Sequence, residues 1–235
     1  MKHLLFLFLF MLITFPAQAQ QEALVDIAED FVPIAEDFDG ARMTLFGALQ
    51  RPRSDIVIVF EGPRAQALVR PKVRQFGIWI NGAPQALNDV LSFYTVLTSR
   101  PLAKIGKAAL WDELGVGISM LDLPGQAGQG VLQNRIAKGL YTEQEGAITI
   151  RDRKLFRADV QLPPNVPVGL YTAHVYEIQK GEVIASRTTN FTVAQVGLGG
   201  HIKKLARNDP WAYALLSLSL VLMIGAMSAY AFNKR

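Results

Sequence analysis

The sequence contains no cysteine and only three histidines, and these absences remove several classes of protein. There can be no disulfide, and no His/Cys cluster exists that would bind zinc or haem. The histidines are dispersed at positions 3, 174 and 201, and neither a G-x-S-x-G motif nor a Gly-rich phosphate loop is present. We therefore expect no cofactor, no metal and no catalytic residues, and predict that the protein is not an enzyme.

The net positive charge of the chain lies outside the segment expected to fold. The sequence pI is near 9.4 and the formal net charge is +4, which would suit a nucleic-acid partner. However, residues 20–200 hold 18 Lys and Arg against 19 Asp and Glu, so the excess lies at the two ends. The sequence therefore gives no support for nucleic-acid binding.

The chain begins with an apolar segment that is short. Lys2 precedes the nearly pure apolar run Leu4–Phe15, and Pro16-Ala17-Gln18-Ala19 ends it with an A-x-A pattern. As a helix the run would reach only about 18 Å, less than the hydrocarbon core of a bilayer. The pattern predicts a signal peptide over residues 1–19. An uncleaved anchor is the alternative.

A second apolar run lies at the other end of the chain. Trp211–Phe232 has 22 residues and no charged side chain, enough for about 33 Å of helix. Pro210 suits the first turn, and aromatic residues lie at both margins. We predict one transmembrane helix over residues 210–232, with the lipid bilayer as its partner. A face with small-xxx-small spacing predicts helix packing, with lipid exposure as the alternative; it comprises Ser217, Val221, Gly225 and Ala229.

The orientation of this span depends on two signals that disagree. Three cations precede the span (Lys203, Lys204 and Arg207) and two follow it (Lys234 and Arg235), which slightly favours the reverse orientation. A signal peptide commits the chain that follows to export, and we give it the greater weight. We expect an inner-membrane protein with a periplasmic body and a cytoplasmic tail.

Between the two apolar ends, short runs with period-two alternation predict strands. Ala41–Leu49 and Asp55–Gly62 read as a strand pair around Arg51-Pro52-Arg53, followed by Arg74–Gly82 and Val90–Thr98. One or two strands are expected in residues 146–162, and residues 168–196 form a hairpin that turns at residues 179–182. The predicted fold class is mainly β: an immunoglobulin-like β-sandwich with a helical insertion, plus one C-terminal transmembrane helix.

Three further details belong to this prediction. The insertion covers about residues 101–146, with one helix after Pro101 and a second over Val131–Glu145. Tyr171 follows a proline-rich corner, so its hydroxyl is expected to bind the backbone of that corner. Trp79 is expected to be a central core aromatic. The predicted segments are 1–19 signal peptide, 20–33 acidic leader, 34–196 periplasmic domain, 197–209 flexible linker and basic segment, 210–232 span and 233–235 tail.

Residues Asp26–Gly40 contain an acidic repeat, in which Ile27–Phe31 returns as Ile34–Phe38. Pro33 disfavours one continuous helix through both copies. We expect the first copy to be a mobile or short helical leader and the second to begin the first strand. Asp37-Phe38-Asp39-Gly40 resembles part of a calcium loop, but the remaining EF-hand ligands are missing.

Several segments together resemble a known family. They are "GIWING", "FYTVLTSRPL", "LFRADVQLPPNVPVGLYTAHVYEI" and the closing single span. The chain is similar, from about Ile34 to its C-terminus, to the family of putative transmembrane proteins of alphaproteobacteria. The resemblance implies a signal peptide, a β-rich exported domain and one C-terminal span. It implies no activity, since the family has no assigned catalytic residues.

The leading functional hypothesis is a non-enzymatic accessory module that binds a membrane transporter or another envelope protein. The candidate partner surface consists of basic residues: Arg64, Arg70, Lys72, Arg74 and Arg100. The alternative is a membrane-tethered hydrolase that uses two carboxylates in a cleft beside the helical insertion. A concave pocket with converging Asp and Glu would favour the hydrolase, whereas a flat or edge-strand surface would favour the binding module.

Overall fold

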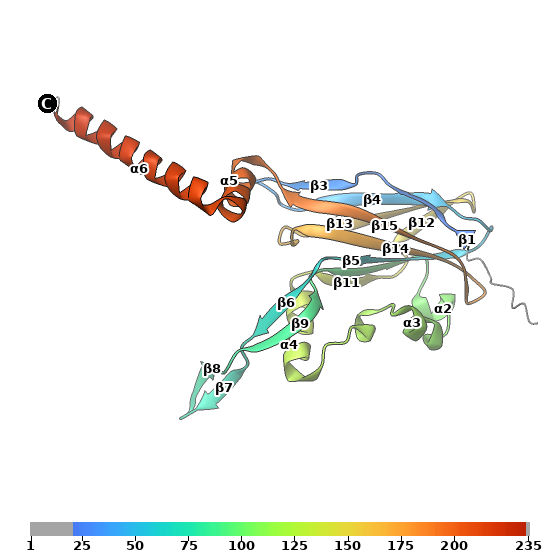
Figure 1. Ribbon diagram of the computed structural model, residues 1–235. Coiled ribbons are helices and arrows are strands. Elements are labelled where there is room, and N and C mark those ends of the chain that lie inside the picture. The colour runs from blue at the N-terminus through green and yellow to red at the C-terminus, as the bar shows by residue number, and fades with distance from the viewer. Residues whose placement is uncertain (1–20, 234–235) are drawn as a thin grey trace, which may run out of the picture.

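Strands dominate residues 21–233, the part of the chain that this computed structural model describes (Figure 1). A helical segment and a terminal apolar helix complete the architecture, which confirms the mainly β class with these two additions. The immunoglobulin-like topology remains a prediction. The expected signal peptide and the last two residues of the expected tail lie outside the described residues.

The larger sheet has seven strands. Its order is β1–β15–β14–β5–β10–β11, and β3 also pairs with β15. The apolar runs of β5 and β10 lie at its centre and are buried almost throughout, as expected for strands covered on both faces. The bounds are β1 Gln21–Glu22, β3 Phe31–Ile34, β5 Asp55–Glu61, β10 Tyr94–Thr98, β11 Tyr141–Gln144, β14 Gly169–Gln179 and β15 Glu182–Gln195.

The smaller sheet has four strands in the order β12–β13–β4–β2. Alternate residues of β13 are buried, because only one face of this sheet meets the core. Buried residues from both sheets form a single apolar cluster, so the sheets share one core. The bounds are β2 Leu24–Ile27, β4 Ala41–Ala48, β12 Ile148–Arg151 and β13 Leu155–Leu162.

The predicted pairing of Ala41–Leu49 with Asp55–Gly62 is wrong. Both segments are strands, but β4 pairs with β13 and β2, whereas β5 pairs with β14 and β10. The intervening residues cross from one sheet to the other. Glu177, which is fully buried, accepts the backbone N–H groups of Gln50 and Arg51 at 2.9 and 3.0 Å and thereby fixes the crossing.

The C-terminal hairpin agrees with its sequence prediction. β14 pairs with β15 from Gly169 to Gln179, with one irregularity between Glu177 and Ile178, and the chain turns at Lys180 and Gly181, both with positive φ. Tyr171 is buried, and its hydroxyl donates a hydrogen bond to the backbone oxygen of Pro167 at 2.6 Å, as predicted for the corner. Burial raises the pKa of this phenol.

The expectation for the acidic repeat is wrong in both copies. Residues of the predicted leader form β2, which pairs with β4, and the leader's end starts β3, which runs parallel to β15. The second copy forms the turn after β3 rather than the start of a strand. Val25 and Val32 reach the core from β2 and β3, and this burial outweighs the repulsion among carboxylates that remain in solvent.

The helical insertion lies beside the larger sheet and differs in detail from its prediction (Figure 1). The first predicted helix is divided at Gly106. The second begins six residues earlier than expected and ends before Gly139 (φ 67°), and the chain then enters β11, parallel to β10. The bounds are α2 Leu102–Ile105, α3 Ala108–Leu114, the 3-10 helix Ile118–Met120 and α4 Gly125–Ala137.

A two-stranded arm leaves the body between β5 and β10 (Figure 1). Near the body β6 pairs with β9, and further out β7 pairs with β8. The predicted strand Arg74–Gly82 is wrong, because the chain reverses at Phe76-Gly77 inside it. The prediction that Trp79 is a core aromatic is also wrong, since this side chain is 65% exposed on β8. The bounds are β6 Arg64–Val69, β7 Lys72–Gln75, β8 Ile78–Asn81 and β9 Gln85–Leu91.

Two helices end the described chain. Residues 197–208, expected to include a flexible joint, form α5 (Gly197–Asn208). α6 (Pro210–Asn233) follows, with 24 residues and a length of about 36 Å, and its composition is apolar enough for a membrane span. The arm and α6 project from the same end of the body, α6 at the upper left and the arm at the lower left of the view (Figure 1).

Candidate binding arm and cationic groove

The arm, residues 64–91, is the most exposed part of the body. From Arg70 to Ala86 only Pro71 and Gly82 are partly covered, and none is buried. Pro71 and Pro84 lack a backbone N–H and stand where the ladder is interrupted between its inner and outer parts. The N–H of Gly82 still bonds to the oxygen of Pro71 at 2.8 Å across this joint. The arm is therefore a ribbon whose ladder is interrupted near its middle.

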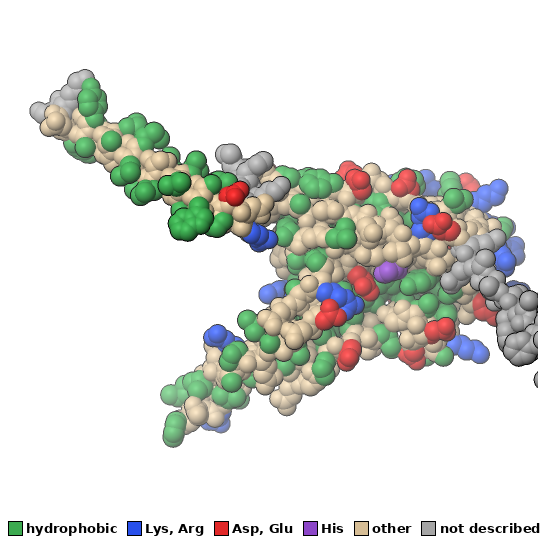
Figure 2. Space-filling model, viewed as in Figure 1, with side chains coloured by type: hydrophobic (Ala, Val, Ile, Leu, Met, Phe, Trp, Pro, Cys, Tyr) green, Lys and Arg blue, Asp and Glu red, His purple; other side chains and the backbone are tan. Residues whose placement is uncertain are grey.

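The tip of the arm presents large apolar side chains to solvent (Figure 2). Phe76 is fully exposed, and Ile78 and Trp79 are 67% and 65% exposed. Phe76 and Gly77 have φ of +49° and +83°, the left-handed conformations of a two-residue hairpin turn. Such a turn prefers Asn-Gly, and a phenylalanine at positive φ costs about 1 kcal/mol or more. An aromatic residue thus occupies the turn although another residue would fit its backbone better.

The outer ribbon has two chemically different faces. Arg74 lies opposite Trp79 and Lys72 opposite Asn81, so one face carries two cations beside an indole. Val73 lies opposite Ile80, with Ile78 next along the same face, which makes the second face aliphatic. The tip combines aromatic, aliphatic and cationic groups on one small element.

The structure brings four of the five predicted surface cations onto the arm. Arg64 begins β6, where it forms an ion pair with Asp89 at 2.9 Å and approaches Glu61 at 4.0 Å. Arg70, Lys72 and Arg74 lie further out and make no ion pair with any residue between 21 and 233. Three uncompensated cations are therefore available on the outer arm, and Arg64 is neutralised at its base.

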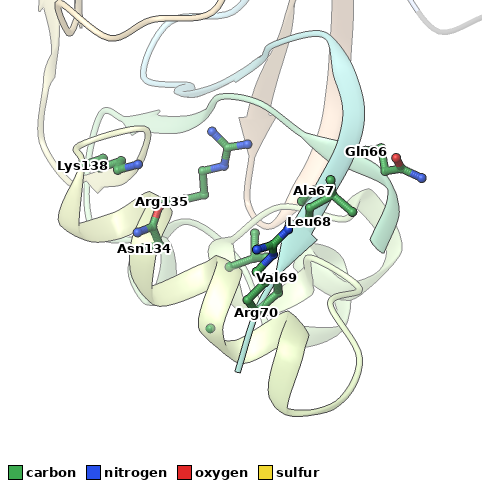
Figure 3. Close-up of a pocket in the computed structure, with 10 residues that line it drawn as sticks. Gln66, Ala67, Leu68, Val69, Arg70, Asn134, Arg135 and Lys138 are labelled. Atoms are coloured by element: carbon green, nitrogen blue, oxygen red, sulfur yellow. The ribbon is translucent and has the colours of Figure 1, made fainter. Parts of the chain in front are cut away.

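A cationic groove lies where β6 faces α4 (Figure 3). It has a volume of about 460 Å³, and Arg70, Arg135 and Lys138 line it with Asn134 and Gln66. Val69 and Val131 supply apolar surface, and no carboxylate is part of the lining. Arg135 and Lys138, like Arg70, form no ion pair within the described residues. A concave site with three unpaired cations favours an anionic ligand group.

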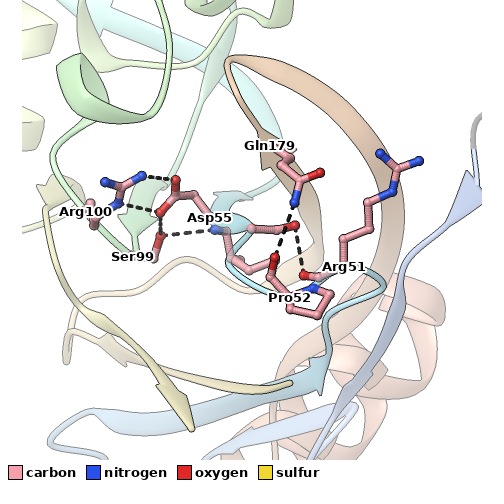
Figure 4. Close-up of polar contacts among 8 residues, drawn as sticks. Arg51, Pro52, Asp55, Ser99, Arg100 and Gln179 are labelled. Atoms are coloured by element: carbon pink, nitrogen blue, oxygen red, sulfur yellow. Dashed lines mark hydrogen bonds and ion pairs between the residues drawn. The ribbon is translucent and has the colours of Figure 1, made fainter. Parts of the chain in front are cut away.

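Arg100, the fifth predicted cation, does not belong to this surface. It follows β10 and binds Asp55, at the opposite end of β5 from the arm (Figure 4). Its Nε donates to Asp55 Oδ1 at 2.7 Å, a second bond joins its Nη2 to Oδ2, and the Ser99 hydroxyl donates to the same carboxylate at 3.0 Å. The bond to Asp55 raises the pKa of the guanidinium. Because Asp55 is buried, we assign Arg100 a structural role.

A second hollow, of about 470 Å³, lies between the base of the arm and the helical insertion, and it gathers three carboxylates. Glu61, Asp89 and Asp122 line it, but Arg64 approaches the first two and reduces their availability as an acid–base pair. Tyr94 also lines it, and burial raises the pKa of Tyr94 to about 12, so this phenol remains protonated at neutral pH. Residues 21–233 contain no group of three or more His, Cys, Asp or Glu suited to a metal ion. This holds also for Asp37 and Asp39, which resemble part of a calcium loop in the sequence.

The predicted helix-packing face lies along α6. Ser217, Val221, Gly225 and Ala229 follow one another at four-residue spacing on this straight helix, and a Cβ at Gly225 would meet nothing within 4 Å. The face is accessible to another helix or to lipid, and the packing stays a prediction.

Sequence reasoning missed the tip and half of the groove. The signal for the tip was present in the dipeptide Phe76-Gly77, which divides two period-two runs, but a turn there was not expected from a phenylalanine. Arg135 and Lys138 are far from Arg70 in sequence, and only the packing of α4 beside β6 brings them together. No local pattern could have indicated this groove.

Comparison with known proteins gives one family. No curated protein matches the chain. A family model with the description "Putative transmembrane protein" matches residues 23–234, which is nearly all of the sequence. This range includes the arm, α6 and every strand of the two sheets except β1. The chain therefore belongs to this transmembrane protein family.

Proposed function

We propose that the chain is a single-pass inner-membrane protein whose two-sheet body lies in the periplasm and acts as a non-enzymatic accessory module. Its arm and cationic groove bind an acidic segment of a partner, a membrane transporter or another envelope protein. The observation that carries this proposal is a set of cations on the arm and at the C-terminal end of α4 that form no ion pair with residues 21–233: Arg70, Lys72, Arg74, Arg135 and Lys138.

The geometry favours binding over catalysis. The outer arm, from Arg70 to Ala86, is exposed and contributes nothing to the core, so a partner can contact it without disturbing the body. A carboxylate-rich segment would complement the groove, because guanidinium groups bind carboxylates through two parallel hydrogen bonds. Of the three carboxylates that line the hollow beside the insertion, Glu61 and Asp89 are instead engaged by Arg64.

Crosslinking in intact membranes followed by affinity capture of the full chain tests this proposal. A variant with Arg70, Lys72 and Arg74 changed to Ala should lose the captured partner, because three attractive charges leave the binding surface. A matched control removes the same charge from the turn between β12 and β13: Arg151, Arg153 and Lys154 changed to Ala. These residues are also exposed, so the control should retain the partner.

Two results would contradict the proposal. One is an unchanged crosslink pattern in the arm variant, which removes the arm as a binding surface. The other is equal loss in both variants, which would mean that only total charge matters. A second variant, with only Arg135→Ala and Lys138→Ala, tests the contribution of the groove apart from that of the arm.

A further inference from the structure

We propose that the tip of the arm inserts into the headgroup region of the bilayer that α6 spans, and that it prefers anionic phospholipid. This goes beyond the proposed function, because it adds a lipid contact at the tip: Lys72 and Arg74 serve both contacts, whereas Arg70 and the rest of the groove serve the protein partner alone. The tip is defined as residues 72–81.

The side chains of the tip are those that suit the interface between water and lipid. Phe76, Ile78 and Trp79 are exposed apolar groups with no contact that covers them in the described chain. Aromatic side chains are enriched at the headgroup level, where one end is apolar and the other meets water. The bilayer is also the apolar phase nearest at hand, since α6 is long and apolar enough to cross it and the chain belongs to a transmembrane protein family.

The charges of the tip complement a phospholipid surface. Lys72 and Arg74 lie on one face of the ribbon beside Trp79, and neither forms an ion pair with a described residue. Cations beside a membrane are attracted to anionic headgroups, and the attraction falls with added salt. No acidic residue interrupts the segment from Arg70 to Leu87, so nothing on the outer arm repels the lipid surface.

The position of the arm makes the contact possible. The arm and α6 leave the body at the same end (Figure 1). Transmembrane helices commonly tilt by about 20° and range up to about 40°, and a tilt of this size toward the arm would bring its tip closer to the bilayer. The interruption of the ladder near Pro71 and Pro84 provides a second place where the angle of the tip can adjust.

The backbone conformation of Phe76 also supports insertion of the tip. Its positive φ is unfavourable for a phenylalanine, whereas the hairpin turn would readily accept asparagine. Strain of this kind persists where the side chain serves another purpose. Here the purpose is insertion of the Phe76 ring, which is otherwise fully exposed, into the lipid headgroup region.

Insertion of the tip can be tested with a single spin label, because the native chain has no cysteine that would also react. Gln75→Cys introduces a unique thiol beside Phe76 without removing any apolar residue of the tip, and a nitroxide attached there reports its surroundings. The full-length protein is reconstituted into vesicles of phosphatidylcholine with or without phosphatidylglycerol. We expect the ratio of oxygen to nickel-complex collision rates to rise at position 75, and to rise further with phosphatidylglycerol. A label at Glu182→Cys, beside the distant hairpin turn, should keep the collision-rate ratio of an aqueous site in both kinds of vesicle.

Two variants separate insertion from folding. Phe76→Asn keeps the turn, since Asn-Gly is its preferred sequence, and it should return the label at position 75 to an aqueous ratio. Lys72→Gln with Arg74→Gln should abolish only the dependence on phosphatidylglycerol. Partner capture should survive Phe76→Asn, so failure of insertion and failure of the proposed function are distinguishable.

Two outcomes overturn the inference. In the first, the label at position 75 stays aqueous in every lipid mixture. In the second, it is shielded from both collision reagents and shows dipolar broadening with a label on another copy, which would mean that the tip binds a second chain.

Discussion

The five basic residues that the sequence singles out have different surroundings, although each contributes one positive charge. Arg100 holds a buried carboxylate and Arg64 holds an exposed one, whereas Arg70, Lys72 and Arg74 have no acidic partner among the residues described. Burial of the partner distinguishes a cation that stabilises the fold from one that is free to bind. The distinction depends on tertiary contacts and is absent from the sequence.

This difference gives a stability prediction for Arg100. Arg100→Ala leaves the Asp55 carboxylate with the Ser99 hydroxyl as its remaining side-chain partner, so we expect the free energy of unfolding to fall by about 1–3 kcal/mol. Arg70→Ala is the control and should change stability by less than about 0.5 kcal/mol. Urea unfolding followed by tryptophan fluorescence measures both. Equal effects would contradict the structural assignment of Arg100.

Tyr94 gives a prediction on pH. Its hydroxyl accepts the N–H of Gly117 at 2.9 Å and donates to the oxygen of Gly115 at 3.3 Å, and burial raises its pKa from 10.0 to about 12. Above pH 10 the unfolded chain therefore releases a proton that the folded chain retains, so stability falls with rising pH until about pH 12. The slope from this group approaches 1.4 kcal/mol per pH unit.

The urea midpoint measured from pH 8 to pH 11.5 tests this prediction. Tyr94→Phe should be less stable at pH 8, because the N–H of Gly117 loses its acceptor, and it should lose less stability between pH 10 and 11.5. Tyr171 and Tyr176 retain their own raised pKa values, so a smaller slope remains in the variant. An unchanged slope would show that Tyr94 does not contribute.

At the scale of elements, helix α4 contains two glycines with opposite requirements. A Cβ at Gly128 would stand 2.2 Å from the backbone oxygen of Leu123, whereas a Cβ at Gly130 would meet only the Val69 side chain at 4.0 Å. Gly128 is therefore needed for the close approach of the preceding loop, and Gly130 is not.

This contrast predicts opposite effects of the same substitution. Gly128→Ala should destabilise the helical insertion by about 1–3 kcal/mol, because backbone must move. Gly130→Ala should stabilise α4 by about 0.5–1 kcal/mol through its higher helix propensity. Hydrogen exchange of the amides in α4 reports both changes directly. Faster exchange in both variants would show that the helix has no room at either position.

Elements with strong local patterns were predictable from the sequence. The β14–β15 hairpin carries period-two alternation, and α6 carries an unbroken apolar run, so each was correctly expected in type and place. The failures lie where tertiary contacts decide. β4 and β5 have equally clear strand patterns, but which sheet each joins depends on β13 and β14, more than 100 residues later. Likewise, only the parallel partner β15 turns the residues around Pro33, Phe31–Ile34, into a strand.

At the scale of the whole molecule, the proposed orientation can be tested by labelling. The chain has no native thiol, so Glu182→Cys on the body and Asn233→Cys after the span are unique sites. In intact spheroplasts that express the full chain, a membrane-impermeant maleimide should label position 182 and not position 233. Lysis should expose both. Labelling of position 233 alone would reverse the orientation and with it the periplasmic location of the arm.

The attachment of the body to its anchor has a mechanical consequence. The chain leaves the body through β15, and at that exit β15 is held by β14 on one side and by the parallel strand β3 on the other, with a final bond from the N–H of Val196 to the oxygen of Ile34 at 3.0 Å. A pull on the anchor acts along these strands, so their hydrogen bonds share the load and must rupture together rather than one after another. Force from a partner that tugs on the body is thus expected to tilt or bend α5 and α6 before it extracts β15.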